Sequence, residues 1–161
     1  MNLIIANRQR TKKINTRLLR QIAEDVLAHL KVEKVELGIT LVGAKAMARV
    51  NWQFLQHVGP TDVITFDHME KRKAESGKRK ELHGELFVCV DEAVGQAKEF
   101  KSSWQSEVVR YVVHGVLHLL GHDDLKPALQ RKMKQEENRQ MRRLTRSFAL
   151  AQLSRPVKMA P

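Results

Sequence analysis

Apolar side chains recur at helical spacing in some stretches of the chain and alternate with polar side chains in others. From residue 15 to residue 30 they fall three or four positions apart, which indicates a helix. From Val35 to Leu41 every second residue is apolar, which indicates a half-buried strand. Similar patterns, with β-branched residues marking 62–66, predict strands at 2–6, 62–66 and 85–90, and helices at 44–55, 92–100, 103–120 and 127–148.

This order of elements predicts an α+β fold, with a small mixed four-stranded sheet packed with helices. Residues 68–83 are polar and crowded with charge, so we expect an exposed loop between two antiparallel strands. Residues 1–153 are predicted to form a single domain, and 154–161 a disordered tail.

Composition narrows the class of protein. Hydrophobic residues make up 42% of the 161 positions, as in globular domains. No stretch approaches the roughly 20 apolar residues that span a bilayer, and the first residues lack the order of a signal peptide. Cys89 is the single cysteine, so an internal disulfide framework is excluded. We therefore expect a cytoplasmic protein with no membrane partner.

The net charge of +11 suggests a polyanionic partner, because phosphate contacts dominate non-specific binding to nucleic acid. The excess is uneven, since residues 126–161 contain ten basic and two acidic residues. A solvated basic helix face is the alternative, and charge alone leaves it open.

The stretch from His114 to Asp124 carries the candidate chemistry. Two imidazoles four residues apart, at His114 and His118, lie on one face of a helix. Gly121 can end that helix, since glycine readily adopts a left-handed conformation, and the chain can then bring Asp124 back. Two nitrogens and one carboxylate oxygen form a three-ligand set for one zinc ion, with a fourth position open. We predict this site at the end of the central helix and in the following turn.

Three alternatives bear on this site. His122 is a rival to Asp124 as the third ligand. The two histidines could instead be core residues with satisfied nitrogens. Zinc peptidases often carry a glutamate directly after the first histidine as the general base, but Gly115 stands there, which disfavours proteolysis. Hydrolysis of a phosphodiester remains open. Asp123 or Asp62 is expected to accept a hydrogen bond from a ligand ring.

Three short segments of the sequence together resemble the YbeY family of single-strand-specific metallo-endoribonucleases. The family signature H-G-x-L-H-L-x-G-Y-D-H is matched here by H-G-V-L-H-L-L-G-H-D-D, which begins at His114. The family block P-T-D-V-L-S-F is matched by residues 60–66, and G-D-I-x-I by residues 84–88. The resemblance covers about residues 1–145 and implies action on ribosomal RNA at the small ribosomal subunit and its associated proteins.

The resemblance also implies roles for residues. The first two zinc ligands of the family fall on His114 and His118, and its third histidine falls on Asp124. The family arginine thought to contact the RNA phosphate falls on Leu55, so the catalytic residue is unassigned. His57 or a lysine of residues 71–80 is a substitute candidate. Asp62 and Thr65 have two interpretations: they contact the substrate or a metal ligand, or they are a strand-start cap and a solvent-facing threonine.

Two functions follow as hypotheses. The first is a single-strand-specific, zinc-dependent endoribonuclease that acts in 16S ribosomal RNA 3′-end maturation and ribosome quality control. Whether water or the ribose 2′-hydroxyl attacks the phosphate stays open. The alternative is a non-catalytic, RNA-binding ribosome-assembly factor with a structural zinc, which Leu55 in place of arginine favours.

Overall fold

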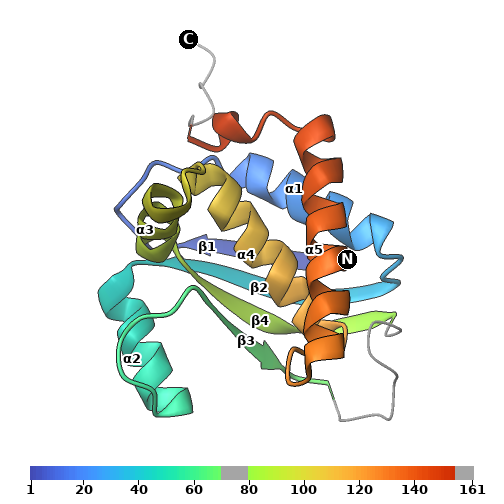
Figure 1. Cartoon of the computed structure of the whole chain (residues 1–161), viewed down its shortest axis with the longest axis horizontal. Helices are drawn as coiled ribbons and strands as arrows, with labels where there is room; N and C mark the ends of the chain where they lie inside the picture. The colour runs from blue at the N-terminus through green and yellow to red at the C-terminus, as the bar shows by residue number, and fades with distance from the viewer. Residues whose placement is uncertain (70–79, 155–161) are drawn as a thin grey trace.

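The computed structural model describes residues 1–69 and 80–154 (Figure 1). Every strand and helix expected from the sequence is present, and a short 3₁₀ helix, η1, is added. In chain order the elements are β1 (Asn2–Asn7), α1 (Thr16–His29), β2 (Lys34–Val42), α2 (Ala44–Leu55), β3 (Val63–Asp67), β4 (Glu81–Cys89), α3 (Val90–Phe100), α4 (Trp104–Leu119), α5 (Pro127–Ser147) and η1 (Leu150–Ser154).

The sheet has four strands in the order β1-β2-β4-β3. β1 runs parallel to β2, and β2 runs parallel to β4. β3 pairs antiparallel with β4 at the edge, with Thr65 opposite Leu86. The sheet is therefore mixed, which confirms the α+β prediction, including the antiparallel pairing of the last two strands.

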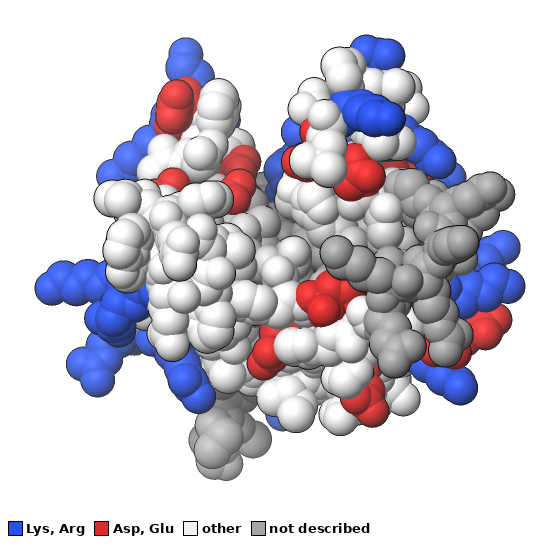
Figure 2. Space-filling model, turned by 90° about the horizontal axis from the view of Figure 1, so that it is seen from below, with Lys and Arg blue, Asp and Glu red and all other residues white. Residues whose placement is uncertain are grey.

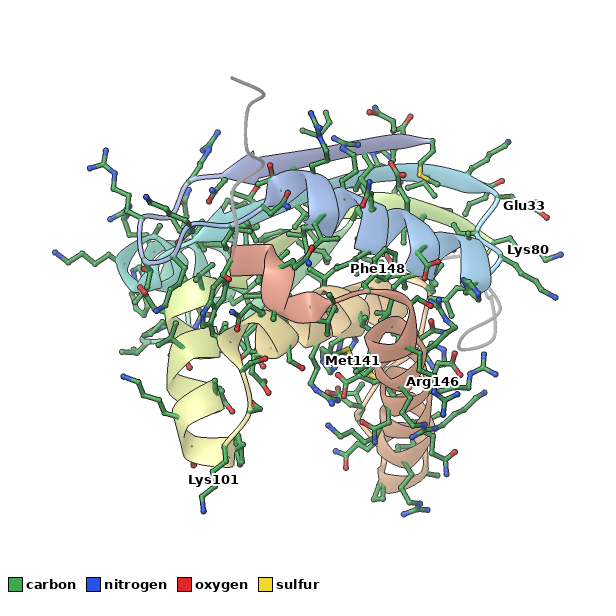
Figure 3. The ribbon with its side chains drawn as sticks, turned by 90° about the horizontal axis from the view of Figure 1, so that it is seen from above. Glu33, Lys80, Lys101, Met141, Arg146 and Phe148 are labelled. Carbon is green, nitrogen blue, oxygen red and sulfur yellow. The ribbon has the colours of Figure 1, made fainter. Side chains whose placement is uncertain are left out.

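Helices cover one face of this sheet. α1 and α4 pack on it directly, and the main core joins their apolar faces to those of the strands. α3 and α5 project beyond α4 on the side away from the sheet. In Figure 3, Lys101 marks the end of α3 and Met141 lies on α5. α2 contributes no residue to this core. Its Met47 packs with Val42, Ile64 and Cys89 in a smaller apolar cluster. Among the described residues, no helix has the length and apolar character to cross a membrane.

α4 is the central helix. Ser103 caps its start, where the side chain accepts a hydrogen bond from the backbone N–H of Ser106. Nine of its residues are buried, which fits a helix packed on most sides. Gly115 lets it approach β4 closely, because a Cβ at this position would lie 2.6 Å from Cδ2 of the buried Leu86. The helix ends at Leu119, and Gly121 follows with a left-handed φ of 96°.

The structure moves one boundary. β4 begins at Glu81 rather than near residue 85, so His83 belongs to a strand rather than to a loop. Its buried residues alternate with exposed ones that face the uncovered side of the sheet. Residues 70–79 of the expected loop, and all of the expected tail except Ser154, lie outside the described residues. A single domain over 1–153 stays a prediction.

Candidate metal centre

Three potential ligands meet where α4 ends. His114 and His118 lie on the last turns of α4, and Asp124 lies in the turn that leads to α5. The two Nε2 atoms are 3.1 Å apart, and Nε2 of His118 is 3.9 Å from Oδ2 of Asp124. Two nitrogen ligands on one tetrahedral zinc ion lie about 3.3 Å apart. Since one ligand atom from each of the three residues falls within 4.8 Å of the others, the cluster can hold a metal ion.

Local hydrogen bonds hold the turn that carries Asp124. After Gly121 reverses the chain, the backbone N–H of Leu125 donates to Oδ1 of Asp123. Nε2 of Gln130, on the first turns of α5, donates to the backbone carbonyl of Asp124 over 2.7 Å. The third potential ligand is therefore positioned by a contact with α5, although half of its side chain is exposed.

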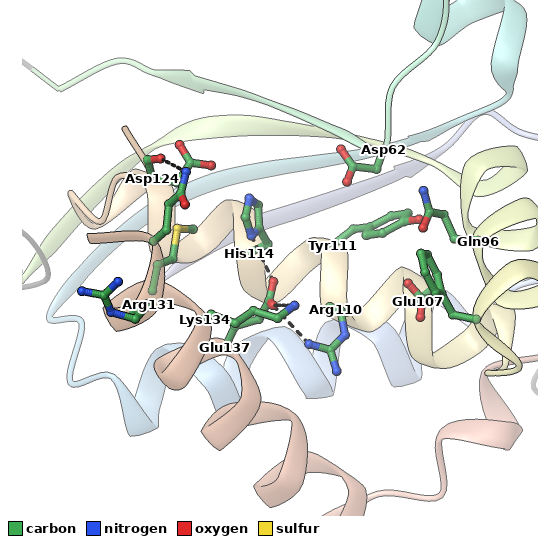
Figure 4. Close-up of a pocket in the computed structure, with 13 residues that line it drawn as sticks. Asp62, Gln96, Glu107, Arg110, Tyr111, His114, Asp124, Arg131, Lys134 and Glu137 are labelled. Atoms are coloured by element: carbon green, nitrogen blue, oxygen red, sulfur yellow. Dashed lines mark hydrogen bonds and ion pairs between the residues drawn. The ribbon is translucent and has the colours of Figure 1, made fainter. Parts of the chain in front are cut away.

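A buried carboxylate on α5 orients the first histidine. Oε1 of Glu137 lies 3.0 Å from Nδ1 of His114. Its other oxygen, Oε2, accepts from Lys134 at 3.0 Å and from Arg110 at 3.1 Å (Figure 4). When Nδ1 donates to this carboxylate, Nε2 of His114 presents its lone pair to the cluster, which is the arrangement a metal-binding histidine needs.

The electrostatics suit metal binding. Burial alone would raise the pKa of Glu137, but hydrogen bonds from His114 and Lys134 outweigh it and lower the pKa to about 2. Burial lowers the pKa of His118, and the neighbouring His114 lowers it further. At neutral pH the carboxylate is therefore ionised and the His118 ring is neutral, as a metal ligand must be.

Glu137 is the functional residue that the sequence analysis missed. Among the described residues, neither ligand ring forms a hydrogen bond with Asp123 or Asp62, which were expected in this role. Oδ1 of Asp62 instead accepts from the backbone N–H of Val63 at 2.7 Å. The available signal was an acidic residue within the apolar stripe of α5, because Glu137 is only 4% exposed.

His122 lies outside the cluster of potential ligand atoms. Its ring is buried, and burial lowers the pKa of His122, with Lys132 of α5 as the next contributor in the same direction. The geometry therefore groups Asp124, rather than His122, with the two helical histidines.

Two hollows meet at the cluster. The larger, about 670 Å³, lies between α3, α4 and α5, and Figure 2 shows the notch between the two projecting parts of the molecule. The smaller, about 390 Å³, lies between the end of α2, the following loop and β3. Asp62, His114 and Asp124 line both hollows. The candidate metal centre thus lies between two open hollows, which we together call the groove, rather than at the bottom of one closed pocket.

The smaller hollow also brings together the other candidate residues. Leu55, His57, Asp62 and Thr65 all line it beside the two ligand histidines. The lysines of residues 71–79 lie outside the described residues, and Lys80 pairs with Glu33 and does not line the hollow. Among the described residues, His57 is therefore the one candidate substitute for the arginine that lies at the site.

Four large exposed apolar side chains lie on the end of α2 and in the loop after it, and one of them, Leu55, lines this hollow. Trp52 is 60% exposed, Phe54 57%, Leu55 45% and Val58 91%, and we call these four residues the apolar rim. The buried residues of α2 are Met47 and Asn51, so the helix packs through Met47 and leaves Trp52 outside the core.

Comparisons with known proteins identify relatives of this chain. A family model described as endoribonuclease YbeY matches residues 4–145. An endoribonuclease YbeY of Kineococcus radiotolerans is 35% identical over 151 residues, which cover 92% of this chain and 84% of that protein. One of Chlorobium luteolum is 31% identical over 146 residues, which cover 91% of this chain and 100% of that protein.

A solved structure shows the same fold. The solution structure of a Thermotoga maritima protein superposes with a TM-score of 0.65 at 25% identity, over 99% of this chain and 100% of that chain. The matching region contains His114, His118 and Asp124 and both hollows. The chain therefore belongs to the YbeY endoribonuclease family.

Proposed function

We propose that this protein is a zinc-dependent endoribonuclease that cuts single-stranded RNA. Its proposed substrate is precursor 16S ribosomal RNA near the 3′ end, and its proposed setting is cytoplasmic ribosome maturation and quality control with the small ribosomal subunit. The observation that carries the proposal is the cluster of His114, His118 and Asp124 inside an open groove.

The donor set supports zinc. Two imidazole nitrogens and one carboxylate oxygen are typical ligands of a catalytic zinc ion, and three protein ligands leave a position for water or substrate. When bound there, zinc would polarise the scissile phosphate and lower the pKa of an attacking water.

The protein groups have separate tasks. Glu137 keeps the proton of His114 on Nδ1, so that Nε2 stays available. Asp124 adds one negative charge, and Gln130 holds its backbone. Because the hollows on both sides share these ligands, a linear chain can lie across the centre and extend at both ends, as cleavage within a strand requires.

The alternative of a non-catalytic assembly factor draws on Leu55. It lines the smaller hollow, where a charged donor to phosphate would be expected, and it offers none. Such a factor would keep its affinity for RNA but show no metal-dependent strand scission at any zinc concentration. A peptidase is less favoured, since Gly115 supplies no general base.

The test uses the full chain and a circular single-stranded RNA, which only an endonuclease can open. We expect cleavage with zinc, loss of cleavage with a chelator, and little cleavage of a duplex. His114→Ala should abolish cutting and binding of one zinc ion per chain. The product ends distinguish the two routes, because attack by the 2′-hydroxyl leaves a 2′,3′-cyclic phosphate.

His29→Ala is the matched control, since it removes an exposed histidine of α1. It should cut and bind zinc like the native chain. If His114→Ala or the chelated protein opens the circle at the native rate, the metal mechanism is wrong.

A further inference from the structure

We propose that the apolar rim is a stacking platform for unpaired bases of the RNA, and that it makes the enzyme prefer single strands. This inference rests on the proposed function and adds a binding surface to it. Large exposed apolar residues concentrate there: within residues 52–58, Trp52, Phe54, Leu55 and Val58 are all exposed. Scattered apolar residues on a surface are ordinary, but Trp52 and Leu55 lie three positions apart on α2, so they are surface neighbours, and Leu55 lines the hollow at the candidate metal centre.

The rim adjoins the candidate metal centre. Leu55 lines the same hollow as His114, His118 and Asp124. Trp52 is one helical turn before Leu55 on α2, and residues three apart on a helix are surface neighbours. A strand that leaves the metal centre through the smaller hollow therefore meets Leu55 and then the Trp52 ring.

Packing and a hydrogen bond hold part of the rim in place. Phe54 packs edge-to-face against Phe66, with ring centroids 5.2 Å apart, and Phe66 packs in the same way against Phe87 at 5.7 Å. Nδ2 of Asn51 donates to the backbone carbonyl of Gly59 over 2.9 Å, which ties the loop after α2 to the helix. Phe54 and this loop would therefore lose little freedom when RNA binds.

The charge around the rim favours RNA over other partners. Residues 44–61 contain no aspartate or glutamate. Lys45, Arg49 and Trp52 are four and three positions apart along α2, so they share one helix face, and all three are exposed. Aromatic rings beside basic side chains are the usual way to bind single-stranded nucleic acid, because bases stack while cations contact phosphates. Paired bases in a duplex are stacked on each other and cannot use the rings.

The first experiment measures binding by the full chain in chelator, which prevents cleavage. The probes are a labelled single-stranded oligoribonucleotide and an abasic strand of the same length. We expect the native chain to prefer the strand with bases. Trp52→Ala should lose at least about fivefold in affinity for that strand and little for the abasic strand. Trp52→Phe should retain most of the affinity, since a ring remains.

Two further variants sharpen the measurement. Ile4→Ala removes an exposed apolar side chain from β1, on the uncovered face of the sheet, and should bind like the native chain. Trp104→Phe leaves Trp52 as the one tryptophan, since the chain has two, and RNA should then quench its fluorescence.

The outcomes separate the two proposals. If Trp52→Ala binds both strands like the native chain while the native chain cuts RNA with zinc, the stacking platform is wrong and the proposed function stands. An equal loss for the abasic strand also overturns it, because the loss would then not involve bases. If the native chain never cuts RNA but its base-dependent affinity needs Trp52, the platform stands and the proposed function fails.

Discussion

The two sides of the groove are built from different chemistry. On the α5 side, Arg110, Arg131, Lys134 and Glu137 line the larger hollow; we call this the charged side, and its ion pairs lead to a ligand histidine. On the α2 side, Leu55 of the apolar rim lines the smaller hollow. The contrast teaches that one candidate metal centre can be held by charge on one side and approached by bases on the other. We therefore expect substitutions on the two sides to change different measured properties of the protein.

The largest effect is expected from Glu137→Ala, which removes the acceptor for Nδ1 of His114. Loss of such a contact typically lowers metal affinity ten- to a hundredfold. Competition with a zinc-binding dye measures this directly. Glu137→Gln should lose less, because its amide oxygen can still accept the hydrogen bond.

Glu136→Ala is the matched control, since it removes the same charge one residue away, where Glu136 pairs with Arg139 rather than with the ligands. Native zinc affinity in Glu137→Ala would mean that the charged side does not support the metal centre.

A second variant transfers charge to the apolar side. Leu55→Arg would place a guanidinium beside the metal centre, and a charged hydrogen bond to phosphate contributes about 1.5–3 kcal/mol. We expect kcat/KM to rise about tenfold or more. Leu55→Lys should gain less, because ammonium offers no planar fork. Equal gains would show that only net charge matters, and a loss of activity would show that the hollow requires an apolar side chain.

The smallest effect is expected from Arg131→Ala. Arg131 lines the larger hollow with Asp124, and among the described residues its guanidinium has no hydrogen bond or ion pair. If it contacts one phosphate of a single strand, its loss should reduce the salt dependence of log affinity by about 0.7 and weaken binding a few-fold. Arg139→Ala, on the same helix and paired with Glu136, should leave the salt slope unchanged. If the two variants show the same salt dependence of log affinity, Arg131 does not contact the RNA.

The sequence predicted what local periodicity and spacing can encode. The helix that carries His114 and His118, the stop at Gly121 and the return of Asp124 all follow from positions within eleven residues. The strands and most helix boundaries follow from apolar spacing for the same reason.

Three features escaped it because they depend on tertiary context. Glu137 lies in a charge-rich helix and becomes buried only when α5 packs on α4, where His114 and Arg110 meet it. The start of β4 was hidden by Glu81 and His83, whose polar side chains face the open side of the sheet. Trp52 has the spacing of a core residue, but α2 packs through Met47 and leaves the ring outside.

The contact between Gly115 and Leu86 also limits what this scaffold can become. A glutamate at position 115 would complete the sequence pattern of a zinc peptidase, yet its first side-chain carbon would lie 2.6 Å from Cδ2 of Leu86, which is fully buried. Relieving the collision requires either a new position for the Leu86 side chain or a shift of α4, the helix that carries His114. An engineer would therefore have to exchange Leu86 together with the glycine to reach the other hydrolytic chemistry.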